Sequence, residues 1–136
     1  MGTVEDASSA LLSCIDPAGP LEVAFLVRRT GAVLASWTRA DVQHEVVSVM
    51  AATMLGSIET MSEALGCPSP GFVAIETDVC RMLATKVEPN ALLVLVADRQ
   101  VGQRVLQASA RRIVAEVSKA MPSNGSRDRR QVPAPQ

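Results

Sequence analysis

Aromatic residues are nearly absent from this 136-residue chain, which has only Phe25, Trp37 and Phe72 and no tyrosine. Proteins that bind single-stranded nucleic acid stack the bases on aromatic side chains, so this scarcity argues against such a function. The 13 Lys and Arg residues are balanced by 14 Asp and Glu residues. Because the net charge is close to zero, the chain has no overall electrostatic attraction for nucleic acid or for an anionic membrane.

Metal-binding and catalytic motifs are also missing. The three cysteines, Cys14, Cys67 and Cys80, are widely separated, and His44 is the only histidine, so no clustered ligand pair begins a zinc site. The sequence has no P-loop, no G-x-G-x-x-G and no H-E-x-x-H, and a single histidine leaves one candidate base for a nucleophile. We expect no enzymatic activity, metal or cofactor, and three reduced, at least partly buried cysteines in a cytoplasmic protein.

Long hydrophobic runs are absent as well. No apolar stretch approaches the roughly 20 residues that a membrane span needs, and the acidic N-terminus lacks the apolar core of a signal peptide. Gly2 suggests myristoylation, but position six is Asp6 where that motif has Ser or Thr. We therefore expect no stable membrane insertion.

Prolines and glycines divide the chain into periodic segments. Helical spacing of apolar residues predicts three helices, over Val4–Cys14, from a cap at Thr38 or Asp41 to Leu65, and from a cap at Asp98 to Met121. Apolar alternation and continuous apolar runs predict five strands, at Leu21–Arg28, Ala32–Trp37, Phe72–Glu76, Val79–Val87 and Ala91–Ala97. Short turns imply antiparallel pairing, and strands apolar on both faces imply helices on both sides of one sheet. We expect one domain over 4–121 and a disordered polar Arg/Pro tail over 122–136.

The predicted second helix is more apolar than covering one face of a sheet requires, since Val46–Ile58 carries no charge. A helical wheel predicts one core stripe, which consists of Val47, Met50, Met54, Ile58, Met61 and Leu65. The opposite flank is built from smaller residues, namely Val49, Ala52, Thr53 and Gly56. A glycine inside a helix costs about 1 kcal/mol relative to alanine, so Gly56 favours a close contact with another chain. A contact within the domain or an Ala-rich solvent face is the alternative.

The third helix and the tail carry a basic patch that Glu116 and Asp128 dilute, and it consists of Arg111, Arg112, Lys119, Arg127, Arg129 and Arg130. We interpret these residues as a solvated helix face plus tail, and an accessory contact with an acidic partner or a lipid surface is the alternative.

Four segments of the chain form a recognisable pattern. They are the hairpin Ala24–Ser36, the helix with Met50, Met54 and Ile58 in phase, the strand F-V-A-I-E at Phe72–Glu76, and A-L-L-V-L-V-A-D at Ala91–Asp98 before the last helix. With these segments the chain resembles the Roadblock family, the dynein light-chain-like domains that regulate small GTPases. The resemblance implies an α+β, profilin-like fold. In this fold a five-stranded antiparallel sheet lies between a long central helix on one face and the N- and C-terminal helices on the other.

The resemblance also implies partners. Members of this family form homodimers, or heterodimers with a paralogue, through the long helix and the strand that follows it. This places the dimer interface at Val49, Ala52, Thr53, Gly56, Phe72 and Ala74. It places the GTPase-binding residues at Gln43, His44, Glu45 and Ser48.

The sequence thus predicts a non-enzymatic dimeric interaction module that scaffolds or regulates a small Ras-like GTPase, by activation or by modulating exchange. A small-molecule-binding sensor domain of similar build is the alternative, with Phe25 and Trp37 lining its pocket. An enzyme with an unrecognised cysteine site or with a carboxylate pair drawn from Glu22, Glu76 and Glu88 is a third possibility.

Overall fold

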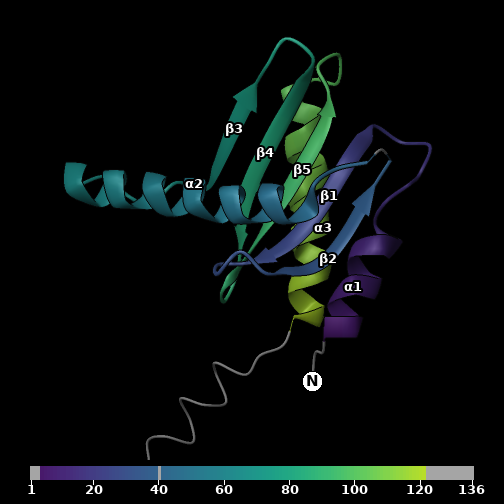
Figure 1. Ribbon diagram of the computed structural model, residues 1–136, viewed down its shortest axis with the longest axis horizontal. Helices are drawn as coiled ribbons and strands as arrows, with labels where there is room; N and C mark the ends of the chain where they lie inside the picture. Colours follow the sequence, from purple (N-terminus) through teal and green to yellow (C-terminus); the bar gives the residue numbers. More distant parts are fainter. Residues whose placement is uncertain (1–3, 40, 122–136) are drawn as a thin grey trace, which may run out of the picture.

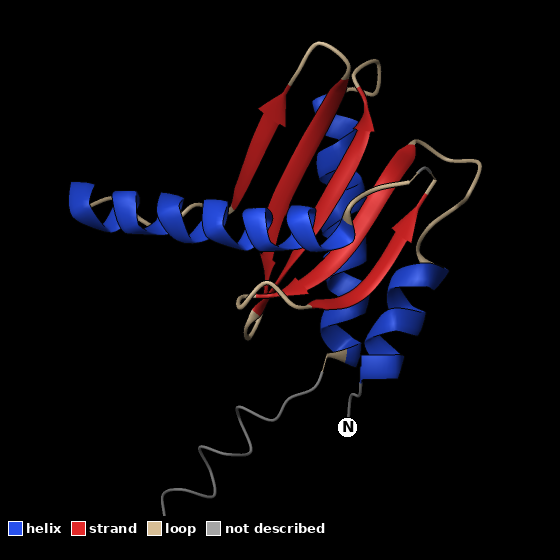
Figure 2. Cartoon of the chain, in the orientation of Figure 1, coloured by secondary structure: helices blue, strands red, loops and turns tan. Residues whose placement is uncertain are grey.

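A computed structural model of the chain describes residues 4–39 and 41–121, which form three helices and one antiparallel sheet (Figure 1). The elements are α1 (Val4–Ser13), β1 (Leu21–Arg28), β2 (Val33–Thr38), α2 (His44–Leu65), β3 (Phe72–Glu76), β4 (Cys80–Val87), β5 (Ala91–Asp98) and α3 (Gln103–Ala120). The strand order is β2-β1-β5-β4-β3. Helix α2 crosses one face of the sheet, and α1 and α3 cover the other (Figure 2). The predicted fold class is confirmed, whereas the predicted tail over 122–136 lies outside the described residues.

The predicted strands agree with the structure to within one residue at each end, but two helices start later than predicted. Helix α2 begins at His44 with Gln43 as its N-cap, so neither Thr38 nor Asp41 caps it, and Thr38 still pairs with β1. Helix α3 begins at Gln103. Asp98 does not cap α3, because its carboxylate accepts a hydrogen bond from the Gln100 N–H at 2.8 Å and so closes a turn directly after β5.

The sheet has a hydrophobic core on each face. Residues of β1 alternate between them, so Phe25 and Val27 face α2 whereas Ala24 and Leu26 face α1 and α3. The core under α1 and α3 is the larger, and its helical side chains include Leu11, Leu106, Ile113 and Val117. The two central strands, β1 and β5, are buried on both faces, as their continuous apolar sequences predict.

The predicted core stripe of α2 is wrong for Met50, Met61 and Leu65, which are exposed, although Val47 and Met54 are partly buried against the core on this face. The buried residues of α2 are Ser48, Ala51 and Leu55, whereas Met50 is 56% exposed and Leu65 is 73% exposed. The buried face is therefore rotated by about one residue, roughly 100°, from the methionine stripe. Small residues at positions 48 and 51 let the helix lie close to the sheet, and a helical wheel based on hydropathy alone does not register this requirement.

Candidate protein-interaction surface

Helix α2 presents an uncovered apolar surface. Half of the exposed large hydrophobic side chains in residues 4–39 and 41–121 belong to this one helix, namely Val46, Val49, Met50, Met61 and Leu65. A monomer does not usually leave so many large apolar side chains together on one element, and such patches mark interaction sites.

The larger part of this surface lies on one side of α2, where Val46, Met50 and Met61 are exposed and Met54 is half-buried against the core. We call this side, with these four residues, the methionine side. Next to it, the α2 face of strands β3 to β5 is hollowed by a groove of about 270 Å³. The groove is lined entirely by apolar side chains, which are Val46, Val47, Met50, Ala51, Met54, Val73, Ile75, Met82, Leu83, Ala84 and Val94. We call this hollow the methionine groove.

The C-terminal half of α2 extends past the edge of the sheet. In Figure 1 the helix crosses the strands and its far end passes beyond β3. All three buried residues of α2 lie in its first twelve positions, and Met61 and Leu65 are exposed. An overhanging apolar helix end and an apolar groove therefore lie on the same face of the sheet.

The predicted small-residue flank lies on the other side of α2, toward the β1–β2 turn. Val49 contacts this turn, because a Cβ atom added to Gly31 would lie 3.1 Å from Val49 Cγ2. Ala52 is half-buried against the core, and the Thr53 hydroxyl donates to the Val49 carbonyl at 2.9 Å. A Cβ atom at Gly56 would meet nothing within 4 Å, so no contact inside the described chain explains that glycine.

The two other residues predicted for the interface, Phe72 and Ala74, lie on the opposite face of the sheet. They pair with Thr85 and Leu83 and share the α3 face with them, while Val73 faces α2. Strand β3 ends the sheet, so its outer edge carries backbone groups without a neighbouring strand among the described residues. One chain therefore does not unite the six predicted residues in a single surface, although β3 itself is an open edge.

An ion-pair network fixes α2 above the β1–β2 turn. Glu59 pairs with Arg29 of the turn and, at 2.7 Å, with Lys86 Nζ of β4, and Ser69 of the following linker donates to Glu59 at 3.4 Å. The hydrogen bond from Lys86 lowers the pKa of Glu59, and the nearby Arg29 charge lowers this pKa further. The network holds the ionised carboxylate and links the middle of α2 to three other segments.

The four residues predicted to bind a GTPase occupy the first turns of α2 but differ in accessibility. Gln43 is the N-cap, and Glu45 is exposed. The His44 ring packs on Phe25, with 5.0 Å between the ring centroids. Ser48 is 1% exposed and its hydroxyl donates to the Glu45 carbonyl at 3.2 Å, so it is not accessible to a partner in this conformation.

Catalytic and metal-binding candidates do not converge. Glu22 pairs with Arg39, whereas Glu76 pairs with Arg81 and Arg99, so these two carboxylates are neutralised at separate places. Across the part of the chain that the structure describes, no three His, Cys, Asp or Glu residues are grouped to hold a metal ion. Among the described helices, none combines the length and the hydrophobicity that a bilayer span requires.

Two expectations about specific side chains need correction. The cysteines are free, but Cys67 is exposed, directly after the glycine that ends α2. Phe25 and Trp37 do not line a common pocket, because Phe25 is fully buried on the α2 face and Trp37 packs against the core on the other face. The register that pairs Trp37 with Ala24 and not with Phe25 causes this separation.

Comparison with known proteins extends these observations. The family model described as Roadblock/LC7 domain matches residues 16–97 of this chain. A search of curated proteins finds no match.

Solved structures match nearly the whole fold. Gliding protein MglB from Thermus thermophilus is 19% identical, with a TM-score of 0.74 over 88% of this chain and 92% of that chain. A Roadblock/LC7 domain from Streptomyces avermitilis is 14% identical, with a TM-score of 0.73 over 82% of this chain and 94% of that one. Profilin II from Acanthamoeba castellanii is 12% identical, with a TM-score of 0.57 over 82% and 96%. At these identities the likeness concerns the fold.

Proposed function

Since the chain belongs to the Roadblock/LC7 domain family, we propose that it is a dimeric, non-enzymatic interaction module that scaffolds or regulates a small Ras-like GTPase. The observation that carries this proposal is the uncovered methionine side of α2 beside an apolar groove. Because the family resemblance implies either homodimers or heterodimers of two paralogues, the second chain of the dimer is either an identical copy or a paralogue.

The geometry supports a dimer formed around the open edge of β3. A two-fold axis at this edge, perpendicular to the sheet, brings β3 beside its mate and carries each α2 overhang across the partner's sheet. Met61 and Leu65 of each copy then reach toward the methionine groove of the other. Two apolar surfaces that are exposed in one chain cover each other in this arrangement, and the β3 edge gains a neighbouring strand.

This dimer is not centred on the small-residue flank that was predicted from the sequence as the interface. In our proposal the dimer uses β3 and the methionine side of α2, with Phe72 and Ala74 close to the seam on the α3 face. The small-residue flank with Val49, Thr53 and Gly56 stays on the side of α2 that points toward the β1–β2 turn. That flank is the competing interface, and the two surfaces are distinguishable by substitution.

The proposed GTPase surface is the outward side of the paired α2 helices, including their N-terminal ends. Gln43, His44 and Glu45 contribute there, and we leave out Ser48 because it is buried. No charged residue occurs between Val46 and Ile58, so Glu45 supplies the charge at this end of the helix. A single charge beside an apolar surface contributes more to the orientation of a bound partner than to its affinity.

Light scattering after size exclusion tests the dimer directly. At micromolar concentration we expect twice the chain mass of 14.4 kDa for the chain alone, or for the chain mixed with a paralogue from the same genome. A monomer mass in both samples would refute the dimer and with it the role of the methionine side.

Binding to the small Ras-like GTPases of the source genome, each loaded with GDP or a GTP analogue, tests the second half of the proposal. We expect Glu45→Lys to weaken the complex about tenfold while the dimer mass stays unchanged. Glu5→Lys makes the same charge change in the first turn of α1, on the other face of the sheet, and serves as the matched control. Single-turnover GTP hydrolysis and nucleotide release then separate activation, exchange and pure scaffolding. The absence of a complex with every GTPase in both nucleotide states would refute the proposal.

A further inference from the structure

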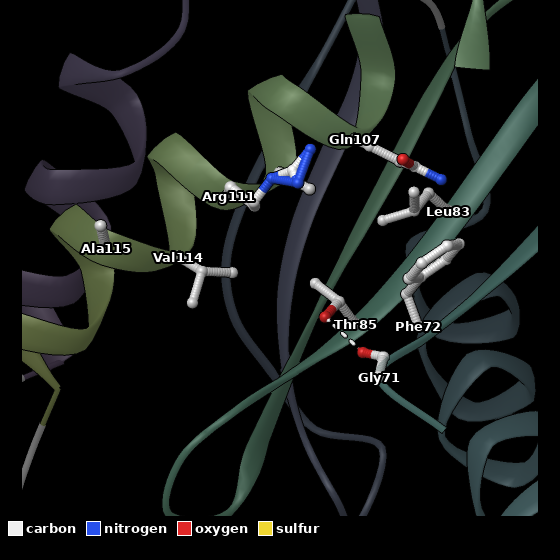
Figure 3. Close-up of a pocket in the computed structure, with 9 residues that line it drawn as sticks. Gly71, Phe72, Leu83, Thr85, Gln107, Arg111, Val114 and Ala115 are labelled. Atoms are coloured by element: carbon white, nitrogen blue, oxygen red, sulfur yellow. Dashed lines mark hydrogen bonds between the residues drawn. The ribbon is translucent and has the colours of Figure 1, made fainter. Parts of the chain in front are cut away.

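A second pocket lies on the opposite face of the sheet, between α3 and the strands β3 and β4 (Figure 3). Its volume is about 470 Å³, within the range of about 300–1,000 Å³ that small-molecule sites occupy. The floor and walls are apolar, formed by Phe72, Leu83, Ala110 and Val114. Because α3 lies under the centre of the sheet, no described helix covers the α3 face of β3 (Figure 1).

The polar side chains that line this pocket differ in whether they already have a hydrogen-bond partner. Thr85 is already used internally, since its hydroxyl donates to the Gly71 carbonyl at 2.9 Å. Gln107 and Arg111 project from consecutive turns of α3 at one side of the pocket, as Figure 3 shows. Within residues 4–39 and 41–121, neither of these two side chains has a hydrogen bond or an ion pair.

Arg111 is the only charged residue among those that line the pocket. No Asp or Glu is among the residues that line it, so the Arg111 guanidinium has no acidic partner there. Four other arginines, Arg29, Arg39, Arg81 and Arg99, each pair with a glutamate, whereas Arg28 and Arg104 resemble Arg111 in having no such pair among the described residues but do not line the pocket. A guanidinium presents a planar fork of donors that matches a carboxylate, and Gln107 adds a neutral donor one turn away.

We propose that this pocket binds a small amphiphile with an unbranched apolar body and a carboxylate head, the chemical class of medium-chain fatty acids. The body lies against Phe72, Leu83 and Val114, and the carboxylate accepts hydrogen bonds from Arg111 and Gln107. The site goes beyond the proposed GTPase module, because it lies on the α3 face and does not involve the methionine side of α2.

Octanoate and 1-octanol are the probes, because they share the apolar chain and differ in the charged head. Titration of the full ¹⁵N-labelled chain, followed by NMR, is expected to show saturable octanoate binding with amide shifts at residues 71–72, 83–85 and 107–115. Shifts confined to the methionine groove, or no saturable binding, would overturn the proposal.

Variants separate the carboxylate contact from general electrostatic attraction. Arg111→Gln is expected to weaken octanoate binding about tenfold, the loss of one charge-assisted hydrogen bond, and to change 1-octanol binding less than twofold. Arg104→Gln removes the same charge from α3 outside the pocket and is expected to change neither. An equal effect of both variants, or none from Arg111→Gln, would overturn the proposal. Ala115→Trp fills the exposed side of the pocket and is expected to weaken both probes, and unchanged binding of both would place the ligand elsewhere.

The dimer mass of each unliganded sample is measured in parallel. A failure of octanoate binding with an intact dimer therefore counts against this site only, and leaves the proposed GTPase function as it stands.

Discussion

Replacing Met50 by glutamate is the sharpest perturbation of the proposed dimer, because this side chain is 56% exposed and so contributes little to the fold of one chain. Complete burial of a methionine is worth about 1.5–3 kcal/mol, so burying the exposed part contributes roughly 1–1.5 kcal/mol in each copy. A two-fold interface contains the residue twice. The two copies together therefore contribute about 2–3 kcal/mol, which corresponds to about 30–150-fold in the dissociation constant of the dimer.

The glutamate variant should lose at least this much, because a carboxylate at the interface must also give up its hydration. Sedimentation equilibrium over a concentration series measures the dissociation constant, and circular dichroism checks that the fold is kept. Met50→Leu keeps the apolar contact and should stay close to the wild type, and Thr60→Glu places the same charge on the outward side of α2. If Met50→Glu leaves the constant within threefold while Gly56→Glu dissociates the dimer, the interface is the small-residue flank and our reasoning is wrong.

The remaining predictions concern the stability of the fold, measured by urea and thermal unfolding at a concentration where the wild type and each variant have the same oligomeric state. Leu55→Ala removes the fully buried anchor of α2 and should cost about 2.7–5 kcal/mol. Gly31→Ala should lower the free energy of unfolding by more than about 1 kcal/mol, because the backbone φ is +100° and the new methyl group lies 3.1 Å from a neighbouring side chain. Gly56→Ala should instead raise the free energy of unfolding by up to about 1 kcal/mol, because the backbone there is helical and the space around the new Cβ is open. The Glu59 carboxylate, whose pKa is lowered in the fold, contributes stability above its ordinary pKa of 4.5, and this contribution is lost as the pH falls through the lowered value. Glu59→Gln should therefore lower the Tm at pH 7 and lose less Tm than the wild type on acidification, and an unchanged acid limb would contradict the proposed ion-pair network.

The open edge of β3 has a consequence for any experiment on the isolated chain. An edge strand with free backbone groups beside exposed apolar residues tends to pair with whatever strand is available. We therefore expect variants that lack the α2 contact, such as Met50→Glu, still to associate through β3 at high concentration. Concentration series, not single points, distinguish this association from the specific dimer.

Much of the fold was predictable because its signals are local. Apolar alternation between proline and glycine breaks depends on a few consecutive residues, and it located all five strands to within a residue at each end. The helix starts were less predictable, since Asp98 looks like a helix cap in sequence but closes a turn with Gln100 in the structure. Local patterns do not say which of two competing hydrogen bonds a side chain makes.

The candidate sites depended on distances between segments, which local patterns do not contain. The sequence alone determined the order of the elements, the family and the excess of apolar surface on α2. Only the tertiary structure decided which side of that helix is buried, because close packing on the sheet favours the small Ser48 and Ala51 over the more apolar methionines. It likewise placed Trp37 on the opposite face of the sheet from Phe25 through the register of two strands, and it left Arg111 without an acidic partner among the residues that line its apolar pocket. Hydropathy indicates how strongly a side chain favours burial, whereas the shape of the neighbouring side chains decides which of several candidates is buried.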